Sequence, residues 1–301
     1  MTSTNAERRA LVTGVTGFAG LHLARLLLED GWQVAGLARG GAAPEGVDLH
    51  RGDIADVGEV IEQVRPSAVF HLAAIVDTVT TPSLEELERV NVGGTQAVVD
   101  ALAGSDMRLV LASSAFVYGS TTPEEQPLSE SQPLRPLTPY GETKVAAEQV
   151  ALAYPGAVVA RSFQHTGPGH VGAYALPDWA EQLARGATTI STGNLDVERD
   201  YLDVRDVARA YAKLADCTAP ERIYNVGSGT PVTMRALLEG LIEAFGTEAE
   251  IVTDPSRVLA VDLPKVVADH SLLTAATGWT PAIDLRTTLA DLAAFWRGRV
   301  A

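Results

Sequence analysis

The sequence contains one cysteine and no long apolar run, and both scarcities narrow the classes of protein that it can encode. The single cysteine, Cys217, excludes an internal disulfide framework and a cysteine-cluster metal site, so we expect no metal. No apolar run is long enough to cross a bilayer, and residues 1–10 lack the apolar core of a signal peptide. These observations predict a soluble, cytoplasmic protein that does not contact membranes.

Positive charge is also scarce. The 301 residues include 23 Lys+Arg and 38 Asp+Glu, which gives a formal net charge of −15 at pH 7. A general nucleic-acid binder or a binder of anionic membranes needs a basic face, so both classes are disfavoured. A small anionic ligand is still compatible with this balance, because a few arginines in one cleft suffice locally. Only three basic residues are lysines, namely Lys144, Lys213 and Lys265.

Short apolar runs alternate with helical patterns through the first half of the chain. Apolar strands separated by helices are typical of a parallel sheet that is covered on both faces. The expected fold class is therefore α/β, with a doubly wound parallel sheet and a smaller mixed α/β C-terminal domain. Strands are predicted near 10–12, 33–37, 68–72, 108–112 and 157–161, and helices over 18–29, 57–64, 84–103 and 139–153.

The second half of the chain is less regular. Gly167-Pro168-Gly169 marks a break, after which we predict a strand over 223–226 and helices near 233–245 and 286–297. We predict a nucleotide-binding domain over residues 1–165 and a substrate-binding domain over residues 166–301. A segment near 199–229 is expected to return to the first domain.

A glycine-rich turn directly follows the first predicted strand. Its G-x-x-G-x-x-G spacing permits a tight turn, a close approach of backbone N–H groups to a pyrophosphate, and close packing of the next helix. The phosphates would bind at the N-terminus of helix 18–29. This strand–turn–helix context predicts a Rossmann dinucleotide-binding domain. The predicted cofactor contacts in this turn are Gly14, Thr16, Gly17, Phe18, Ala19 and Gly20.

The residue that follows the second strand bears on the choice of dinucleotide. An acidic residue there would bind the ribose 2′-hydroxyl of NAD, whereas Arg39 suits the 2′-phosphate of NADP. We therefore favour NADP(H) as the cofactor, with NAD(H) as the alternative. The competing interpretation of Arg39 is a surface arginine that does not bind the cofactor. Further along, Asp53 and Ile54 are predicted to flank the adenine, with Asp53 accepting from its amino group.

Tyr140 and Lys144 lie one helical turn apart and therefore share a helix face. A phenol has an ordinary pKa near 10, and a nearby ammonium group stabilises the phenolate and lowers that pKa. Upstream, Ser113 and Ser114 follow a strand and are expected at the carboxyl edge of the sheet, where ligands bind. A hydroxyl there can hold a carbonyl oxygen while the tyrosine donates its proton.

Five motifs together resemble those of the extended short-chain dehydrogenase/reductase family over essentially the whole chain. The resemblance implies a catalytic triad of Ser114, Tyr140 and Lys144. Tyr140 would be the general acid/base, Ser114 would orient and polarise a carbonyl, and Lys144 would also hold the nicotinamide ribose. The motifs are Gly14-x-x-Gly17-x-x-Gly20, His71-Leu72-Ala73-Ala74, Asn91-Val92-x-Gly94-Thr95, Ser113-Ser114 with Val117-Tyr118-Gly119, and Tyr140-x-x-x-Lys144. The further cofactor contacts that it implies are Leu72, Ala73, Ala74, Asn91 and Ala112.

The second half of the chain resembles the family members that act on nucleotide sugars. The segment 161–169 is similar to a segment of enzymes that act on nucleotide sugars. The stretches 193–196 and 199–207 resemble the GDP-sugar branch, which contains GDP-mannose 4,6-dehydratase and GDP-4-keto-6-deoxymannose reductase. The resemblance makes Gln164 a sugar or phosphate contact and Arg199 a diphosphate contact. Alternatively, Gln164 is a loop residue and Arg199 pairs with Asp196 or Asp200.

One position departs from the pattern of the family. An arginine that binds diphosphate often precedes the last helices, and Leu259 stands at that position. Arg257 could substitute for it only if the loop is displaced. A diphosphate without this cation would bind more weakly, so guanine, thymine and a sugar without a nucleotide all stay open. The predicted substrate contacts are Asp77, Ser114, Ala115, Phe116, Gln164, Arg199 and Arg257.

Residues near the predicted triad discriminate between the reactions of the family. Phe116 stands where dehydratases carry a glutamate, and Ala115 and Phe116 stand where reductoepimerases carry a cysteine, so both reactions are disfavoured. The 4-epimerases share a similar segment but typically hold NAD with an acidic residue after the second strand. We therefore predict NAD(P)H-dependent reduction of the C4 ketone of a GDP- or dTDP-linked 4-keto-6-deoxyhexose. The alternatives are a nucleotide-sugar 4-epimerase and a non-catalytic Rossmann binding protein.

Members of this family commonly form homodimers through the helix that carries the tyrosine and the helix before it. We therefore predict a homodimer built on helices 84–103 and 139–153. The alternative is that the apolar residues of these helices pack only on the sheet. The apolar positions concerned are Val98, Val99, Leu102, Val145, Val150 and Leu152.

Overall fold

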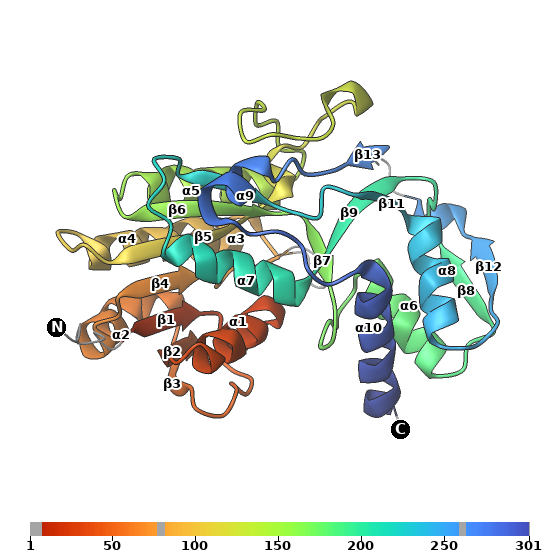
Figure 1. Cartoon of the computed structure of the whole chain (residues 1–301), viewed down its shortest axis with the longest axis horizontal. Coiled ribbons are helices and arrows are strands. Elements are labelled where there is room, and N and C mark those ends of the chain that lie inside the picture. Colours follow the sequence, from red (N-terminus) through yellow and green to blue (C-terminus); the bar gives the residue numbers. More distant parts are fainter. Residues whose placement is uncertain (1–7, 77–81, 259–262, 301) are drawn as a thin grey trace.

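A computed structural model describes residues 8–76, 82–258 and 263–300 of the chain (Figure 1). Asp77 and Leu259, which the sequence analysis singled out, lie outside the described residues. No helix in the described part of the chain combines the length and apolarity that crossing a membrane requires.

The core of the larger part of the molecule is a seven-stranded sheet in which all paired strands run parallel. The spatial order is β10-β6-β5-β4-β1-β2-β3, so the direction of strand succession reverses beside β1. This reversal is the point at which open α/β sheets bind ligands at their carboxyl edge. The strands are β1 (Arg9–Thr13), β2 (Gln33–Ala38), β3 (Asp48–Arg51), β4 (Ala68–His71), β5 (Arg108–Ser114), β6 (Ala157–Ser162) and β10 (Ile223–Val226).

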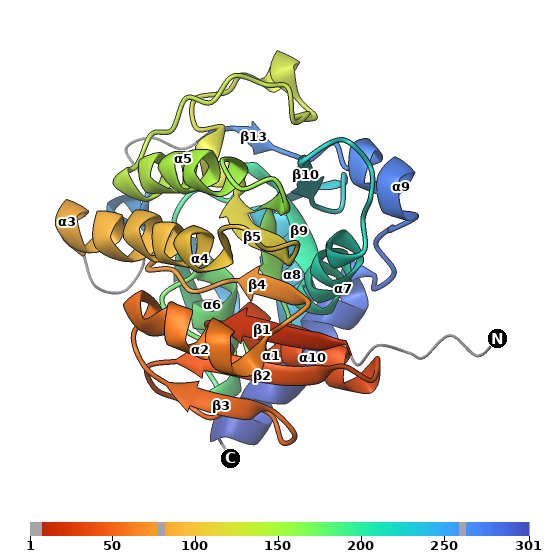
Figure 2. The same ribbon diagram turned by 90° about the vertical axis from the view of Figure 1, so that its left-hand side faces the viewer.

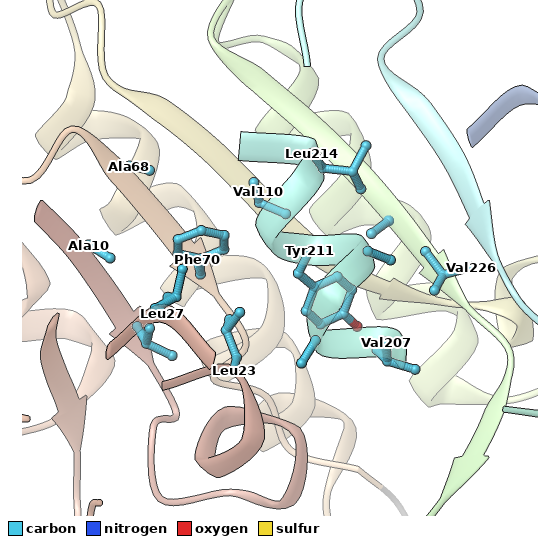
Figure 3. Packing of buried hydrophobic residues seen from close by; sticks show 14 of the residues in the cluster. Ala10, Leu23, Leu27, Ala68, Phe70, Val110, Val207, Tyr211, Leu214 and Val226 are labelled. Carbon is cyan, nitrogen blue, oxygen red and sulfur yellow. The ribbon is translucent and has the colours of Figure 1, made fainter. Parts of the chain in front are cut away.

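Helices cover both faces of this sheet because the strands are apolar on both sides. On one face, α1 (Phe18–Glu29) and α7 (Val204–Ala215) pack side by side over Phe70 and Val110, as Figure 3 shows. On the other face lie α2 (Val57–Val64), α4 (Gly94–Leu102) and α5 (Pro139–Leu152) (Figure 2). The predicted fold class, a doubly wound parallel α/β sheet, is therefore confirmed.

The predicted helix over 84–103 is a succession of three helical segments. It begins as α3 (Leu84–Leu87), continues as a π-helical segment over Glu88–Gly93, and ends as α4. Ser83 forms the N-terminal cap of α3 by accepting from the Glu86 N–H at 3.2 Å. The π segment carries Asn91, one of the predicted site residues, and such bulges are frequent at functional sites.

The smaller part of the molecule contains two short sheets and three helices that share a core. Strands β11, β9 and β13 form one sheet, with β7 also pairing with β9, and β12 pairs with β8. Helices α6, α8 and α10 bury their apolar faces against one another. The strands are β7 (Gln164–Thr166), β8 (Thr189–Thr192), β9 (Glu198–Asp203), β11 (Pro231–Thr233), β12 (Glu250–Thr253) and β13 (Lys265–Val266). The helices are α6 (Ala175–Ala184), α8 (Met234–Ala244) and α10 (Leu285–Val300), whereas α9 (Ser271–Thr277) packs against β10 of the large sheet.

Several of these elements were not among the sequence-based predictions. The clearest case is α7, whose buried Val204, Val207, Tyr211 and Leu214 recur at helical spacing. The chain crosses between the two parts more than once, because β9 belongs to a small sheet whereas α7 and β10 lie on the large one. The division into domains over 1–165 and 166–301 stays a prediction.

Candidate active site

The glycine-rich turn after β1 has a shape that only glycine permits at two positions. Gly14 has a φ of +71°, and its N–H donates to the carbonyl of Leu37 at 2.9 Å. A Cβ at Gly20 would lie 2.3 Å from the Gly14 carbonyl oxygen. Gly17 precedes α1 and provides no side-chain cap, so the first N–H groups of that helix are available for an anion. The turn therefore fits the pyrophosphate of a dinucleotide.

The end of β4 lies against this turn and continues the predicted cofactor site. A Cβ at Gly14 would lie 2.9 Å from the Ala73 nitrogen, and the Ala73 N–H donates to the Thr13 hydroxyl at 3.2 Å. Asn91 is buried, and its side chain accepts from the Ile75 N–H at 2.8 Å and donates to the Thr143 hydroxyl at 3.1 Å. Asn91 thus ties residues 72–75 to α5. These bonds support the site, and the cofactor contact predicted for Asn91 stays a prediction.

At the adenine end, Asp53 already has a structural function. Its carboxylate caps the short 3₁₀ turn that begins at Ile54, accepting from the Ala55 N–H at 3.2 Å. Arg89 lies 3.6 Å from the same carboxylate. An ionised carboxylate has about four acceptor positions, so these contacts still leave capacity for an adenine amino group. The binding of adenine by Asp53 stays a prediction.

The three residues of the predicted triad come together from β5 and α5. Thr138 caps α5, so Tyr140 lies in its first turn. Lys144 is 5% exposed, and its Nζ donates to the Ala112 carbonyl at 2.7 Å. A Cβ at Gly141 would lie 2.8 Å from the Phe116 carbonyl oxygen, so α5 approaches the residues after Ser114 as closely as a glycine allows.

Burial determines the protonation of the two groups on α5. It raises the pKa of the Tyr140 phenol above its ordinary value, and a hydrogen bond with Ser114 opposes that rise. We expected the Lys144 ammonium to lower this pKa; burial raises it instead. Burial also lowers the pKa of Lys144 to about 8, while the nearby Glu148 carboxylate opposes the fall. Tyr140 is therefore a neutral proton donor at neutral pH.

A buried ion pair that the sequence analysis missed lies directly behind the triad. Arg161 of β6 and Glu148 of α5 are each 3% exposed in their side chains and lie 2.8 Å apart. Ser113 donates to the same carboxylate, so Ser113 is engaged with Glu148 while Ser114 meets Tyr140. A signal did exist in the sequence, because Tyr140, Lys144 and Glu148 recur every four residues on one helix face.

Phe116 closes one side of the predicted site. Its ring meets that of Tyr140 edge-on with a centroid separation of 5.8 Å, and the residue is 49% exposed. Ala115, in contrast, is buried. No side chain in this pair can exchange a proton at neutral pH. Phe116 therefore offers a substrate an apolar contact and no acid or base.

The predicted substrate contacts in the second half of the chain differ in whether they already bind other groups of the protein. The amide oxygen of Gln164 is buried and has no hydrogen-bond partner in the described part of the chain. Arg199 donates to the Leu263 carbonyl at 2.7 Å, and Arg257 lies 3.4 Å from the Asp178 carboxylate. An orphaned buried acceptor is costly, so Gln164 has the signature of a ligand contact.

Aromatic rings join the cofactor side of the molecule to this region. Phe18, the first residue of α1, stacks on His170 with centroids 4.5 Å apart and on His165 with centroids 5.9 Å apart. His22 adds a hydrogen bond to the Pro168 carbonyl at 2.8 Å. The segment that begins at Gln164 is thereby packed directly against the helix that follows the glycine-rich turn. Sequence analysis gave no indication of this contact.

Comparison with known proteins agrees with the resemblance that the motifs predicted. The chain is similar to GDP-6-deoxy-D-mannose reductase of Pseudomonas aeruginosa, with 32% identity over 97% of this chain and 98% of the relative. It is also similar to UDP-glucose 4-epimerase of Mycolicibacterium smegmatis, with 30% identity over 97% and 99% of the two chains. Both relatives are matched over nearly their whole length.

Solved structures of similar proteins also match nearly the whole chain. The structure of RMD from Pseudomonas aeruginosa complexed with NADPH superposes with a TM-score of 0.83 and 30% identity, covering 97% of this chain and 99% of that one. UDP-glucose 4-epimerase from Thermus thermophilus in complex with NAD has a TM-score of 0.83 and 31% identity, covering 96% and 99%. Residues 10–227 match the NAD dependent epimerase/dehydratase family. The chain therefore belongs to that family, and the predicted resemblance to the extended short-chain dehydrogenases/reductases is confirmed.

Proposed function

We propose that the protein reduces the C4 ketone of a nucleotide-linked 4-keto-6-deoxyhexose with NADPH. The observation that carries the proposal is that Ser114 at the end of β5 and Tyr140 in the first turn of α5 lie together, with a phenol whose raised pKa keeps it neutral. Phe116 supports it, because the site has no acid or base where dehydration would need one. The similarity to GDP-6-deoxy-D-mannose reductase over 97% of the chain supports the same class of substrate.

The residues have distinct functions in the proposed reaction. Bound NADPH would supply a hydride to C4 of the sugar. The Ser114 hydroxyl donates a hydrogen bond to the C4 oxygen and stabilises the negative charge that develops on it. The Tyr140 O–H transfers its proton to this oxygen, which is the step that a neutral phenol is suited to perform. Lys144, held on the Ala112 carbonyl, binds the hydroxyls of the nicotinamide ribose.

The nucleotide of the substrate would bind residues of the 166–301 domain, and the sugar would reach the carboxyl edge of the large sheet. Gln164 would accept a hydrogen bond from the sugar or a neighbouring group, which satisfies its buried amide oxygen. Arg199 and Arg257 would have to exchange their present protein partners for the diphosphate. We assign neither the base nor the configuration of the product at C4.

The enzyme is further proposed to act as a cytoplasmic homodimer through α4 and α5. Val98 and Leu102, two of the predicted contact residues, are fully buried in the core against the sheet and cannot contribute to such an interface. The other predicted contact residues, Val99, Val145, Val150 and Leu152, are only partly buried and therefore keep some exposed apolar surface.

A nucleotide-sugar 4-epimerase is the second candidate function. It is favoured by the similarity to UDP-glucose 4-epimerases, which match the chain as completely as the reductase does. The same Ser114, Tyr140 and Lys144 could serve it, with Tyr140 first accepting a proton and then returning one. The two functions differ in whether reducing equivalents are consumed.

The decisive assay follows NADPH oxidation with GDP- and dTDP-linked 4-keto-6-deoxyhexoses. We expect stoichiometric oxidation with one of the two nucleotides, and NMR of the product reads its configuration at C4. Interconversion of 4-hydroxy sugars without added cofactor, together with no NADPH oxidation, would instead identify an epimerase. Cofactor binding without either reaction would indicate a non-catalytic binding protein.

The pH dependence of the reduction should reveal the loss of the Lys144 proton. Because burial lowers its pKa to about 8, the ammonium form is present below pH 8 and is lost above it. The phenol of Tyr140 has a raised pKa and stays protonated throughout this range. We therefore expect kcat/KM to be constant through neutral pH and to fall above about pH 8, as a pH profile of the free enzyme would show. A profile that stays flat to pH 10 would show that the charge of Lys144 is not needed.

A further inference from the structure

Two arginines from neighbouring strands lie at the carboxyl end of one strand pair beside the glycine-rich loop: Arg39 begins the 39–41 turn, and Arg51 contacts it. Arg39 directly follows β2, and Arg51 is the last residue of β3, where it is the Cα partner of Ala38. An Nη2 hydrogen of Arg51 is donated to the carbonyl of Gly41. The guanidinium of Arg51 therefore lies over the 39–41 turn that Arg39 begins.

This turn packs against the loop that fits the pyrophosphate. A Cβ at Gly41 would lie 3.0 Å from the Cβ of Thr16, the residue between the first two glycines of the motif. Strand β2 is joined to the same loop by the hydrogen bond from the Gly14 N–H to the Leu37 carbonyl, at 2.9 Å. An adenosine ribose that extends from the loop along β2 would reach the 39–41 turn.

The electrostatics of the turn favour an anion. At least ten arginines of this acidic protein pair with carboxylates. Arg39 and Arg51 are both exposed, and neither forms an ion pair within residues 8–76, 82–258 and 263–300. The connection 39–47 contains one acidic residue, Glu45. Two positively charged residues at one turn, without carboxylate partners in the described part of the chain, favour a dianionic ligand there.

We propose that Arg51 acts with Arg39 as a two-sided clamp for the 2′-phosphate of NADP(H), which rests on the NADPH-dependent function proposed above. An arginine fork can hold a phosphate through two parallel N–H···O bonds. Arg51 uses one of its five N–H donors on Gly41, and the others are free to contact the ligand. Arg39 alone is what the sequence indicates; the second cation comes from a different strand.

The test measures binding rather than turnover, using 2′,5′-ADP and 5′-ADP as probes in isothermal titration calorimetry of the full-length protein. The wild-type protein should bind 2′,5′-ADP more tightly. Arg51→Ala should weaken 2′,5′-ADP at least about tenfold, as the loss of a charge-assisted contact predicts, and leave the affinity for 5′-ADP unchanged. Arg51→Lys should give an intermediate loss because it keeps the charge without the fork. The 5′-ADP arm verifies that each variant is folded.

Arg25→Ala provides the matched control, because Arg25 is an exposed arginine of the same domain on α1, away from the turn. It should change neither affinity. Equal affinity of the wild-type protein for both probes, an unchanged affinity of Arg51→Ala for 2′,5′-ADP, or an equal loss for both probes would each overturn the clamp. If the clamp holds but 4-keto sugars are not reduced, the proposed reaction fails while this assignment stands.

Discussion

Tyr140→Phe is expected to lower kcat of the proposed reduction by a factor of about 10² to 10⁴, the range that general acid catalysis supplies. The substitution removes only the phenolic oxygen, so the ring can keep its edge-on contact with Phe116. Because no group of the pair Ala115 and Phe116 can donate a proton in its place, the loss should persist at every pH between 6 and 8. Steady-state kinetics of NADPH oxidation would measure it.

Two controls separate loss of the proton donor from loss of structure. NADPH affinity of the Tyr140→Phe variant, followed by fluorescence, should stay within the range of the wild-type protein. Tyr154→Phe is the matched substitution, since Tyr154 also hydrogen-bonds through its hydroxyl, to the Met107 carbonyl at 2.5 Å, but lies after the end of α5. It should leave kcat unchanged. Undiminished turnover of Tyr140→Phe would contradict the assignment of Tyr140 as the acid.

Glu148→Gln is expected to lower the free energy of unfolding by about 3–5 kcal/mol, because it leaves the buried Arg161 charge without its counter-ion. Arg161 cannot give up its proton, and the Glu148 carboxylate accepts from both its Nε and Nη2 groups. The glutamine also keeps only one oxygen acceptor for the donors that two carboxylate oxygens now satisfy, and Ser113 is one of them. Denaturant titration monitored by circular dichroism would measure the change.

The matched control is the same chemical substitution in an exposed pair. Glu181 and Arg185 are 41% and 65% exposed and lie one helical turn apart on α6, so Glu181→Gln should cost at most about 1 kcal/mol. The double variant Glu148→Leu with Arg161→Met should recover much of the stability, because it leaves no buried guanidinium without a counter-ion. If Glu148→Gln costs no more than Glu181→Gln, the pair is not a structural support of the site.

Local sequence patterns were sufficient to predict the elements that residues close together in the sequence determine. The alternation of apolar runs predicted the parallel sheet, and three glycines between a strand and a helix predicted the turn that fits a pyrophosphate. The spacing of Tyr140 and Lys144 placed both residues on one helix face. Helix α7 was not predicted, although its apolar residues recur at helical spacing, because the segment that contains it was interpreted as irregular.

What the tertiary structure alone decided is which of these residues meet and in what environment. Two adjacent serines are equivalent in sequence, yet Glu148 engages Ser113 and leaves Ser114 to Tyr140. Burial, which no local pattern reveals, raises the pKa of Tyr140 and lowers that of Lys144. Arg51 reaches the turn that Arg39 begins only because β3 pairs with β2. The sequence by itself determined the fold class and the triad candidates, since periodicity and spacing act over a few residues. Contacts between distant strands and exclusion of water depend on the whole packed chain, and they decided the chemistry of those residues.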